Sequence, residues 1–564
     1  MSLKLFRTTE FSSSSLFTRT RPTVAVHPLR LVLLCALWLA VMGNLPLWQA
    51  LSQLPETANA RGLLFGVMFC LAIAGANAGL LGLLAWRGLL KPAIVVLLMV
   101  TALSSHYMFV YHVVIDRTML VNVFNTDARE VRDLLSWRLA GTLLVLGVLP
   151  AIWFWRKPVR RVGWVGQAIV NLLTVLGGLL LAVAAVLPVY RDFSSTMRNH
   201  PQLRFLINPL NSVWASGSIV TNTGARASKE LLPIGQDARL GASYAAQARP
   251  PLLLLVVGET ARAGNFGLNG YERPTTPRLA AQNVASFRNA WSCGTNTAAS
   301  VPCMFSHLDK AGYEARKSNY ENLMDVLQRA GLAVLWIDNQ SGCSGPCERI
   351  PNVNTSHEKN AAFCDGGECH DEVMLSGIDE RIAALPAERR AKGVVVVMHP
   401  MGSHGPAYYK RVPAAFKTFK PECASNALQD CARDQVVNAY DNTIVYTDHF
   451  LATAIGWLKT QAQQSAPAMM YVADHGESLG ENNLYLHGLP YSIAPDVQKR
   501  VPWITWMSPA FEERSKVTTA CLKQRLDEKL SHDNYFHSVL GLMDVQTGLY
   551  QPALNMFAAC VGKP

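Results

Sequence analysis

The chain has 564 residues, a formal net charge of +11 and a hydrophobic fraction of 50%. This composition excludes a disordered chain, and the length leaves room for two or more domains. Residues 1–190 hold 16 Lys and Arg against 6 Asp and Glu, a net charge of +10, whereas residues 191–564 carry only +1. Because the basic excess belongs to one apolar part of the chain, we expect no nucleic-acid partner.

The N-terminal third is predicted to span a membrane. Five apolar stretches are each long enough to cross a hydrocarbon core of about 30 Å as a helix. They lie at about 29–50, 62–86, 92–113, 139–155 and 162–188. We therefore expect a tail over residues 1–28 and a five-helix membrane domain over residues 29–190, with an outer loop at 114–136.

The cationic residues between these stretches predict the orientation of the domain. Residues 1–30, 87–91 and 156–161 together carry a net charge of +10, whereas the charges of residues 51–61 and 114–138 cancel. The positive-inside rule places the N-terminus in the cytoplasm, and five crossings then place everything after about residue 190 outside. A cleaved signal peptide is not expected, because the first apolar run starts late and four more follow.

The cysteines agree with this orientation. Cys35 and Cys70 lie inside apolar stretches, and the other ten lie in the exported part. Pairing of nearest neighbours predicts five disulfides: Cys293/Cys303, Cys343/Cys347, Cys364/Cys369, Cys423/Cys431 and Cys521/Cys560. The alternative at Cys343 and Cys347 is a zinc–thiolate site, although no partner pair with the right spacing is present. The connectivity within residues 341–370 stays open.

The exported part divides into an arm and an α/β domain. Residues 191–250 are polar and rich in Ala, Ser and Gly, with one candidate helix at Arg204–Val213. From residue 251, β-rich runs alternate with helical stretches, which predicts a mainly parallel sheet covered by helices on both faces. The expected strands are Leu252–Val257, Ala333–Ile337, Val394–Met398, Met469–Ala473 and Ile504–Met507. The expected helices are Tyr320–Ala330 and Asn438–Gln461.

Four polar segments follow predicted strand ends or their connections, at 256–262, 293–303, 398–406 and 473–480, with His487 shortly after. Any one of their acids or histidines alone would more often be structural. Together they supply the oxygen and nitrogen ligands that suit Zn²⁺, next to a hydroxyl that a metal can activate as a nucleophile. Thr295 follows a glycine and precedes a stretch that can continue as a helix, so it is the expected nucleophile.

In and beside these segments lie the motifs VVGETAR (256–262), NGYERPTTP (269–277), SCGTNTAASVPCMFS (292–306), SHGPAYYKR (403–411) and DHGESLGE (474–481). On these motifs the chain resembles the phosphoethanolamine transferases that modify lipid A, including the mobile colistin-resistance enzymes. The resemblance covers nearly the whole chain. It implies five spans in a bacterial inner membrane, an arm, and a periplasmic soluble domain over residues 251–564 of the alkaline phosphatase/sulfatase type.

The resemblance also implies roles for individual residues. Thr295 matches the nucleophile that accepts phosphoethanolamine and, with Glu259, Asp474 and His475, holds one zinc ion. His404 and His487 match residues that contact the phosphoryl group or a second zinc. The positions that match substrate-binding residues are His399, Asn322, Asn122 and Glu130. For the last two, an interfacial amphipathic helix with its apolar side on lipid is an equally good interpretation.

The implied function is transfer of phosphoethanolamine from phosphatidylethanolamine to lipid A in a zinc-dependent ping-pong reaction, performed by a monomer and expected to confer polymyxin resistance. The alternatives are another acceptor, such as lipopolysaccharide core, or a metal-dependent phosphodiesterase of the same fold. A sulfatase is disfavoured because Thr295 cannot become formylglycine. A transporter is disfavoured because the spans bury no acids or bases.

Overall fold

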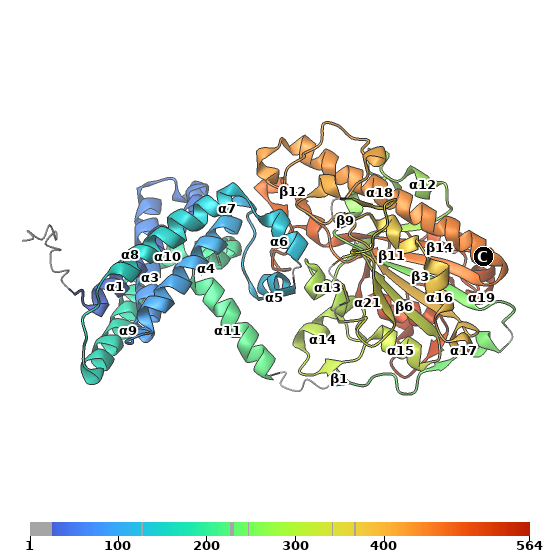
Figure 1. Ribbon diagram of the computed structural model, residues 1–564, viewed down its shortest axis with the longest axis horizontal. Coiled ribbons are helices and arrows are strands. Elements are labelled where there is room, and N and C mark those ends of the chain that lie inside the picture. Colours follow the sequence, from blue (N-terminus) through green and yellow to red (C-terminus); the bar gives the residue numbers. More distant parts are fainter. Residues whose placement is uncertain are drawn as a thin grey trace, which may run out of the picture.

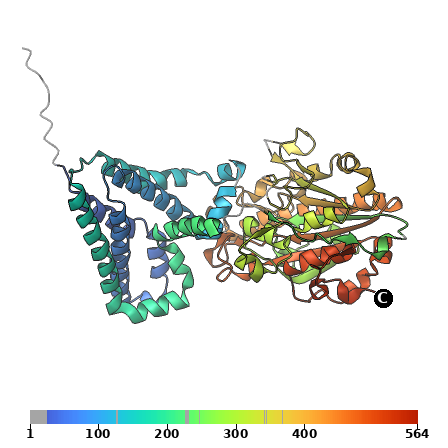
Figure 2. The same cartoon turned by 90° about the horizontal axis from the view of Figure 1, so that it is seen from below.

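The computed structural model describes residues 25–125, 128–225, 231–245, 247–340, 342–343, 345–365 and 368–563. A helical bundle lies at one end of the molecule and an α/β domain at the other, with the N-terminal helices farthest from the C-terminus (Figure 1). The same separation is visible after a quarter turn (Figure 2).

The bundle contains four helical stretches long and apolar enough to span a membrane, at 60–83, 90–110, 137–156 and 164–199. They comprise α3 (Ala60–Leu83), α4 (Leu90–Val110), α7 (Trp137–Thr142) continuing through η2 (Leu143–Val148) to α8 (Leu149–Arg156), and α9 (Trp164–Val186), η3 (Leu187–Val189) and α10 (Tyr190–Asn199). The helices α1 (Pro28–Val41) and α2 (Leu45–Ser52) meet at a bend of 41° and make a fifth candidate only if they are taken as one span.

The bend between α1 and α2 is associated with a proline and with the contacts of the Asn44 side chain. Pro46 lies in the first turn of α2, where it cannot donate a backbone hydrogen bond. The buried Asn44 side chain donates to the backbone oxygens of Leu39 and Asn208, both at 2.8 Å, and so satisfies carbonyls near the break. Since Asn208 precedes α11, this contact also ties the bend to the arm.

The closest helix packing in the bundle is between α3 and α9, where Gly75 and Gly178 face each other. A Cβ atom added to either glycine would lie 2.5 Å from the carbonyl oxygen of the other. Small residues allow such close approach of two backbones, which is the main source of helix association in lipid.

The outer loop forms two short helices, α5 (Arg117–Asn125) and α6 (Ala128–Leu134), which lie between the bundle and the α/β domain (Figure 1). The arm contains η4 (Pro201–Leu206) and α11 (Leu210–Ala225). The predicted helix Arg204–Val213 therefore straddles two helices, because Pro209 interrupts the helical backbone between them.

The α/β domain is built on an eight-stranded mixed sheet with the order β15-β4-β14-β11-β3-β10-β6-β7. Its strands are β3 (Pro251–Gly258), β4 (Ala285–Trp291), β6 (Ala333–Asp338), β7 (Asn352–Asn354), β10 (Val394–His399), β11 (Ala466–Ala473), β14 (Arg500–Met507) and β15 (Leu530–Ser531). All five predicted strands are present. β4, β7 and β15 were not predicted: β7 and β15 are very short, and β4 alternates Arg and Asn with apolar residues.

The direction of the strands is parallel from β11 through β3, β10 and β6 to β7, and β15 is parallel to β4. β14 runs antiparallel to both β11 and β4. Every residue of β3, β6, β10 and β11 is buried, as expected for strands covered on both faces.

The helices α15 (Leu323–Arg329) and α18 (Arg433–Thr460) correspond to the two predicted ones and cover opposite faces of the sheet (Figure 1). Other short helices, including α13 (Thr297–Met304) and α21 (Asp533–Leu542), complete the layers. The five predicted disulfides are all present, at 293–303, 343–347, 364–369, 423–431 and 521–560. Cys35 and Cys70 are free.

Candidate active site

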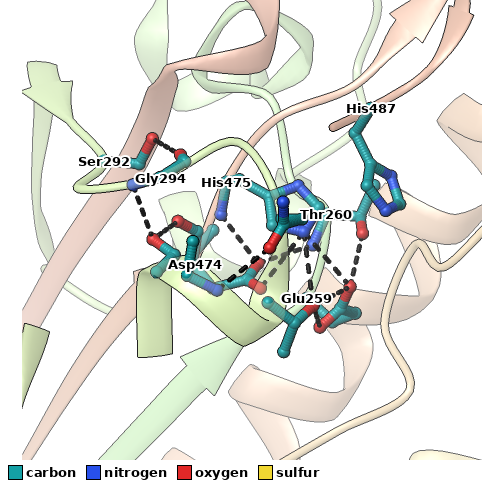
Figure 3. A network of polar contacts seen from close by, with 12 residues as sticks. Glu259, Thr260, Ser292, Gly294, Asp474, His475 and His487 are labelled. Atoms are coloured by element: carbon teal, nitrogen blue, oxygen red, sulfur yellow. Dashed lines mark hydrogen bonds and ion pairs between the residues drawn. The ribbon is translucent and has the colours of Figure 1, made fainter. Parts of the chain in front are cut away.

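The carboxyl ends of β3 and β11 bring three potential metal ligands together. Glu259 follows β3, and Asp474 and His475 follow β11, the neighbouring strand. One ligand atom from each lies within 4.8 Å of the others, and all three side chains are fully buried. His475 Nε2 lies 3.2 Å from Asp474 Oδ2 and 3.7 Å from Glu259 Oε1 (Figure 3).

The backbone around this cluster holds the carboxylates in place. Thr260 adopts a φ of 55°, which is uncommon for a residue with a branched side chain. In this conformation its N–H donates to Asp474 Oδ1 at 3.0 Å and its hydroxyl donates to Glu259 Oε1. Gly402 packs against Glu259 so closely that a Cβ atom there would lie 2.9 Å from the Glu259 carbonyl oxygen.

The hydroxyl that faces the cluster belongs to Thr297. Its Oγ1 lies 3.2 Å and 3.3 Å from the two carboxylate oxygens of Glu259 and 3.3 Å from His475 Nε2. The hydroxyl of Thr295 instead donates to the carbonyl oxygen of Leu489 at 2.6 Å. Thr295, the nucleophile expected from the sequence, is thus occupied by a backbone contact, and Thr297 is the threonine whose hydroxyl lies at the ligands.

The local fold explains this placement. Asn296 is extended and caps α13, since its side-chain oxygen accepts from the N–H of Ala299 at 2.9 Å, and Thr297 is the first residue of the helix. The Cys293–Cys303 disulfide joins the segment before the helix to its last turn. The two threonines lie on opposite sides of the cap residue, and only one of them can face the cluster.

A second polar group lies beside the first. His487 Nδ1 lies 3.0 Å from Glu477 Oε2, and the ring centroids of His487 and His475 are 4.3 Å apart. His404 lies next to His487, with ring centroids 5.9 Å apart. Burial, and the neighbouring His404, lower the pKa of His487 to about 4, so its imidazole is neutral at pH 7.

Glu477 was not singled out from the sequence, although it lies in the motif DHGESLGE. The signal was available, because Glu477 is a second acid only three residues after Asp474. Its carboxylate is fully buried, and burial raises its pKa well above the usual value. Oε1 accepts no hydrogen bond from any described residue.

His399 is buried beside the cluster. Its Nδ1 is 3.1 Å from Asp338 Oδ2 and its Nε2 is 3.6 Å from Glu259 Oε2. Burial alone would lower the pKa of this imidazole, but the hydrogen bond with Asp338 and the nearby carboxylate of Glu259 outweigh it and raise the pKa to about 10. The side chain therefore orients Glu259 as a cationic neighbour.

The remaining predicted residues lie elsewhere. The side-chain oxygen of Asn322 accepts from Met324 N–H and completes a capping box with Asp325, so this residue begins helix α15. Its amide nitrogen donates to the Pro346 carbonyl oxygen at 3.3 Å. Asn122 is half-buried on α5, the loop helix that packs against α13. The side chain of Glu130 lies outside the part of the chain that the structure describes.

The charge of the cluster fits a bound cation. Burial, and the charge of Glu259, raise the pKa of Asp474 to about 7. Burial also works against ionisation of Glu259, but the nearby imidazoles of His399, His475 and His404 hold its pKa well below the usual value. Asp474 Oδ2 accepts no hydrogen bond from any described residue. Two buried carboxylates, an imidazole and a hydroxyl are a donor set that suits Zn²⁺.

Two protein families match different parts of this chain, and together they define the class of protein. The family described as sulfatase matches residues 251–545, and the family described as phosphoethanolamine transferase EptA/EptB matches residues 73–223. The protein is thus a membrane-associated enzyme with a catalytic domain of the alkaline phosphatase/sulfatase type.

Individual relatives narrow this to one family. The chain is 40% identical to phosphoethanolamine transferase EptA of Escherichia coli K12, with 94% of this chain and 96% of that protein aligned. It is 36% identical to phosphatidylethanolamine transferase Mcr-1 of Escherichia coli, covering 92% and 96%. The structure of the integral membrane lipooligosaccharide phosphoethanolamine transferase A from Neisseria meningitidis matches with a TM-score of 0.88 and 33% identity, over 94% of this chain and 98% of that one. The chain belongs to the phosphoethanolamine transferase family, which confirms the resemblance drawn from the motifs.

Proposed function

We propose that this enzyme transfers phosphoethanolamine from phosphatidylethanolamine to a phosphate group of lipid A through a covalent intermediate on Thr297. The observation that carries the proposal is the position of the Thr297 hydroxyl, 3.2–3.3 Å from Glu259 and His475 within a buried set of ligands. Membership of the phosphoethanolamine transferase family supports phosphoethanolamine as the transferred group. The name of the relative Mcr-1, a phosphatidylethanolamine transferase, supports the lipid donor. The name of the lipooligosaccharide phosphoethanolamine transferase from Neisseria meningitidis supports a lipid-linked acceptor.

The reaction takes two steps. The Thr297 oxygen attacks the phosphorus of phosphatidylethanolamine, its proton is lost, and diacylglycerol leaves after its oxygen takes up a proton. A phosphate oxygen of lipid A then attacks the phosphorus of the threonine phosphodiester, and the Thr297 hydroxyl is restored. Both substrates use the same site in turn, so the kinetics are ping-pong.

Glu259, Asp474, His475 and Thr297 would hold one zinc ion. When bound, such an ion lowers the pKa of a neighbouring hydroxyl and offsets the charge of phosphoryl oxygens. His487, whose ring lies beside that of His475, and the adjacent His404 would contact the phosphoryl group. Glu477 hydrogen-bonds His487 and so fixes the orientation of its ring.

The membrane domain brings the lipid substrates to this site. In the proposed orientation the N-terminus is cytoplasmic, the arm and the α/β domain are periplasmic, and the enzyme works as a monomer. The added ammonium group reduces the net negative charge of lipid A. Expression of the enzyme is therefore expected to raise the polymyxin concentration that inhibits growth, since polymyxins are cationic.

The test is a pair of matched variants, Thr297→Ala and Thr295→Ala, assayed for transfer from phosphatidylethanolamine to purified lipid A. Thr297→Ala should lose activity by more than about 1,000-fold, because it removes the nucleophile. Thr295→Ala removes a hydroxyl that bonds Leu489 and should retain a large part of the activity.

Wild-type enzyme incubated with donor alone should carry phosphoethanolamine on the peptide between Arg288 and Lys310, which contains both threonines. Fragmentation of that peptide in the mass spectrometer locates the modified residue. Modification of Thr295, or full activity of Thr297→Ala, would refute the assignment. Release of free phosphoethanolamine at the same rate with and without lipid A would identify a phosphodiesterase instead.

A further inference from the structure

A cavity of about 430 Å³ lies in the helical bundle, far from the catalytic cluster. Its lining comes from the start of α1, the turn between α3 and α4, and the turn between α8 and α9. These three segments lie at one end of the bundle, opposite the ends that lead into α5, α6 and α10 toward the α/β domain (Figures 1 and 2). The volume is within the range of roughly 300–1,000 Å³ that is common for sites of small ligands.

The lining of this cavity is cationic. It includes Arg87, Lys91, Arg160 and Arg161. Residues 84–92 and 155–164 contain no Asp or Glu. Within the described ranges, none of these four cations takes part in an ion pair with a protein carboxylate, so their charge is not neutralised there by the chain itself.

Contacts within the lining hold the cationic segments in a defined arrangement. Lys91 Nζ donates to the Trp155 carbonyl oxygen at 2.6 Å, which joins the start of α4 to the end of α8. The N–H of Arg160 donates to the Val26 carbonyl oxygen at 2.9 Å, which joins the α8–α9 turn to the segment before α1. The rings of Trp86 and Trp164 lie 5.5 Å apart and join the α3–α4 turn to α9.

The same end of the bundle exposes large apolar side chains beside these cations. Trp155 is 53% exposed, Trp164 is 82% exposed and Leu89 is 46% exposed. Tryptophan at the end of an apolar helix is typical of the membrane–water interface. A ligand that meets both groups must therefore combine an anionic head with apolar chains.

We propose that this cavity binds the head group of an anionic phospholipid, with its phosphate among Arg87, Lys91, Arg160 and Arg161 and its acyl chains along the exposed tryptophans. Basic pockets between spanning helices are suited to acidic lipid head groups. A lipid with net negative charge is favoured over phosphatidylethanolamine, because the ammonium of the latter would meet several cations. This site goes beyond the proposed function, since it shares no residue with the Glu259 cluster.

The test uses the full chain, purified in a neutral detergent and titrated with phosphatidylglycerol while bound lipid is counted by native mass spectrometry. We expect one tightly bound phosphatidylglycerol per chain and binding at least about tenfold weaker for phosphatidylcholine with the same acyl chains. Arg160→Gln/Arg161→Gln should weaken phosphatidylglycerol binding about tenfold or more, because two of the four phosphate-facing cations are lost.

The matched control is Arg156→Gln/Lys157→Gln, which removes two cations from the same turn but none from the cavity lining. It should leave the tight site intact. Equal weakening by the two double variants would show a diffuse attraction to the basic surface and overturn the proposal, as would equal binding of phosphatidylcholine. Glycerol phosphate should bind far more weakly than phosphatidylglycerol, and equal affinity would identify a site for a free anion instead. Since the assay measures lipid binding alone, its outcome is independent of transfer activity.

Discussion

The two halves of the molecule bury polar groups in opposite ways. Between the apolar helices, the buried polar residues include neutral amides and hydroxyls such as Asn44, Thr101 and Ser105. The candidate spans contain a single acid, Asp192 in α10, which pairs with Arg61. In the α/β domain, the fully buried residues include Glu259, Asp474 and Glu477, which gather at one edge of the sheet. The helices of the bundle are held together by close packing of their backbones, as at Gly75 and Gly178. The α/β domain instead concentrates buried ionisable side chains at one edge of its sheet.

The difference follows from what each half has available to neutralise charge. A lipid environment offers no water or counterion, so an unpaired carboxylate there is costly. The edge of the sheet has convergent ligands that a cation can neutralise. We therefore expect that metal removal affects the α/β domain, and that changes of residue size affect the bundle.

The largest expected effect is loss of the cation site in Asp474→Asn. Transfer activity should fall more than about 100-fold and bound zinc should fall below one per chain, since a ligand is lost. The metal-free variant should be at least as stable as metal-free wild type, because two buried carboxylates no longer repel each other. Zinc content by mass spectrometry and thermal unfolding with and without chelator measure these outcomes.

The control for this variant is Asp448→Asn, which alters another fully buried acid of the same domain. Asp448 accepts from the N–H groups of Arg278 and Leu279 at 2.9 Å and 2.8 Å and takes no part in the cluster. This change should lower stability but leave zinc bound. Loss of zinc from both variants would mean that the effect on metal is indirect.

An intermediate effect is expected in the bundle from Gly178→Leu. The added side chain cannot fit against Gly75, so the change should destabilise the full chain in detergent by at least about 1–3 kcal/mol. Gly177→Leu is the matched control, since a Cβ atom there meets nothing within 4 Å. Thermal unfolding distinguishes them, and equal midpoints would contradict close packing of α3 on α9.

The smallest effect is expected where the two halves meet. Asp133 of α6 is buried and accepts from Arg411 Nη2 at 3.0 Å, and Arg411 Nε donates to the His404 carbonyl oxygen at 3.1 Å. Asp133→Asn should cost about 1–3 kcal/mol and reduce transfer severalfold without loss of zinc.

Asp430→Asn is the comparison at the same interface, because the Arg138–Asp430 pair is largely exposed and should contribute only about 0–1 kcal/mol. For each of the two variants, the unfolding midpoint measures the change in stability and the rate of transfer from the lipid donor measures the change in activity. If the exposed pair proved to matter as much as the buried one, α6 would not be the contact that holds the loop on the α/β domain.

Much of the fold could be predicted from local patterns. Apolar runs identified the spans, buried β-rich runs identified β3, β6, β10, β11 and β14, and close spacing identified the disulfide pairs. The bend between α1 and α2 was not predicted, because it depends on a contact of Asn44 with Asn208, 164 residues away. The antiparallel direction of β14 was equally out of reach, since strand direction leaves no mark in a short apolar run.

In the candidate site, too, some features could be predicted from local sequence patterns and others depend on tertiary contacts. The acids and histidines that follow strands were visible in the sequence, because strand ends in a mainly parallel region meet at one edge. The choice between Thr295 and Thr297 was not visible. Both hydroxyls flank Asn296, and the sequence offers no local reason to prefer the second.

The sequence by itself determined the kinds of groups this protein brings to the membrane surface and the chain segments that supply them. Periodicity, charge distribution and spacing are local properties, so they are readable without a fold. The tertiary structure alone decided that Thr297 faces Glu259, that His399 lies between Asp338 and Glu259, and that four cations line a cavity at the far end of the bundle. Each of these depends on contacts between distant segments, and their geometry is set only when the helices and strands pack.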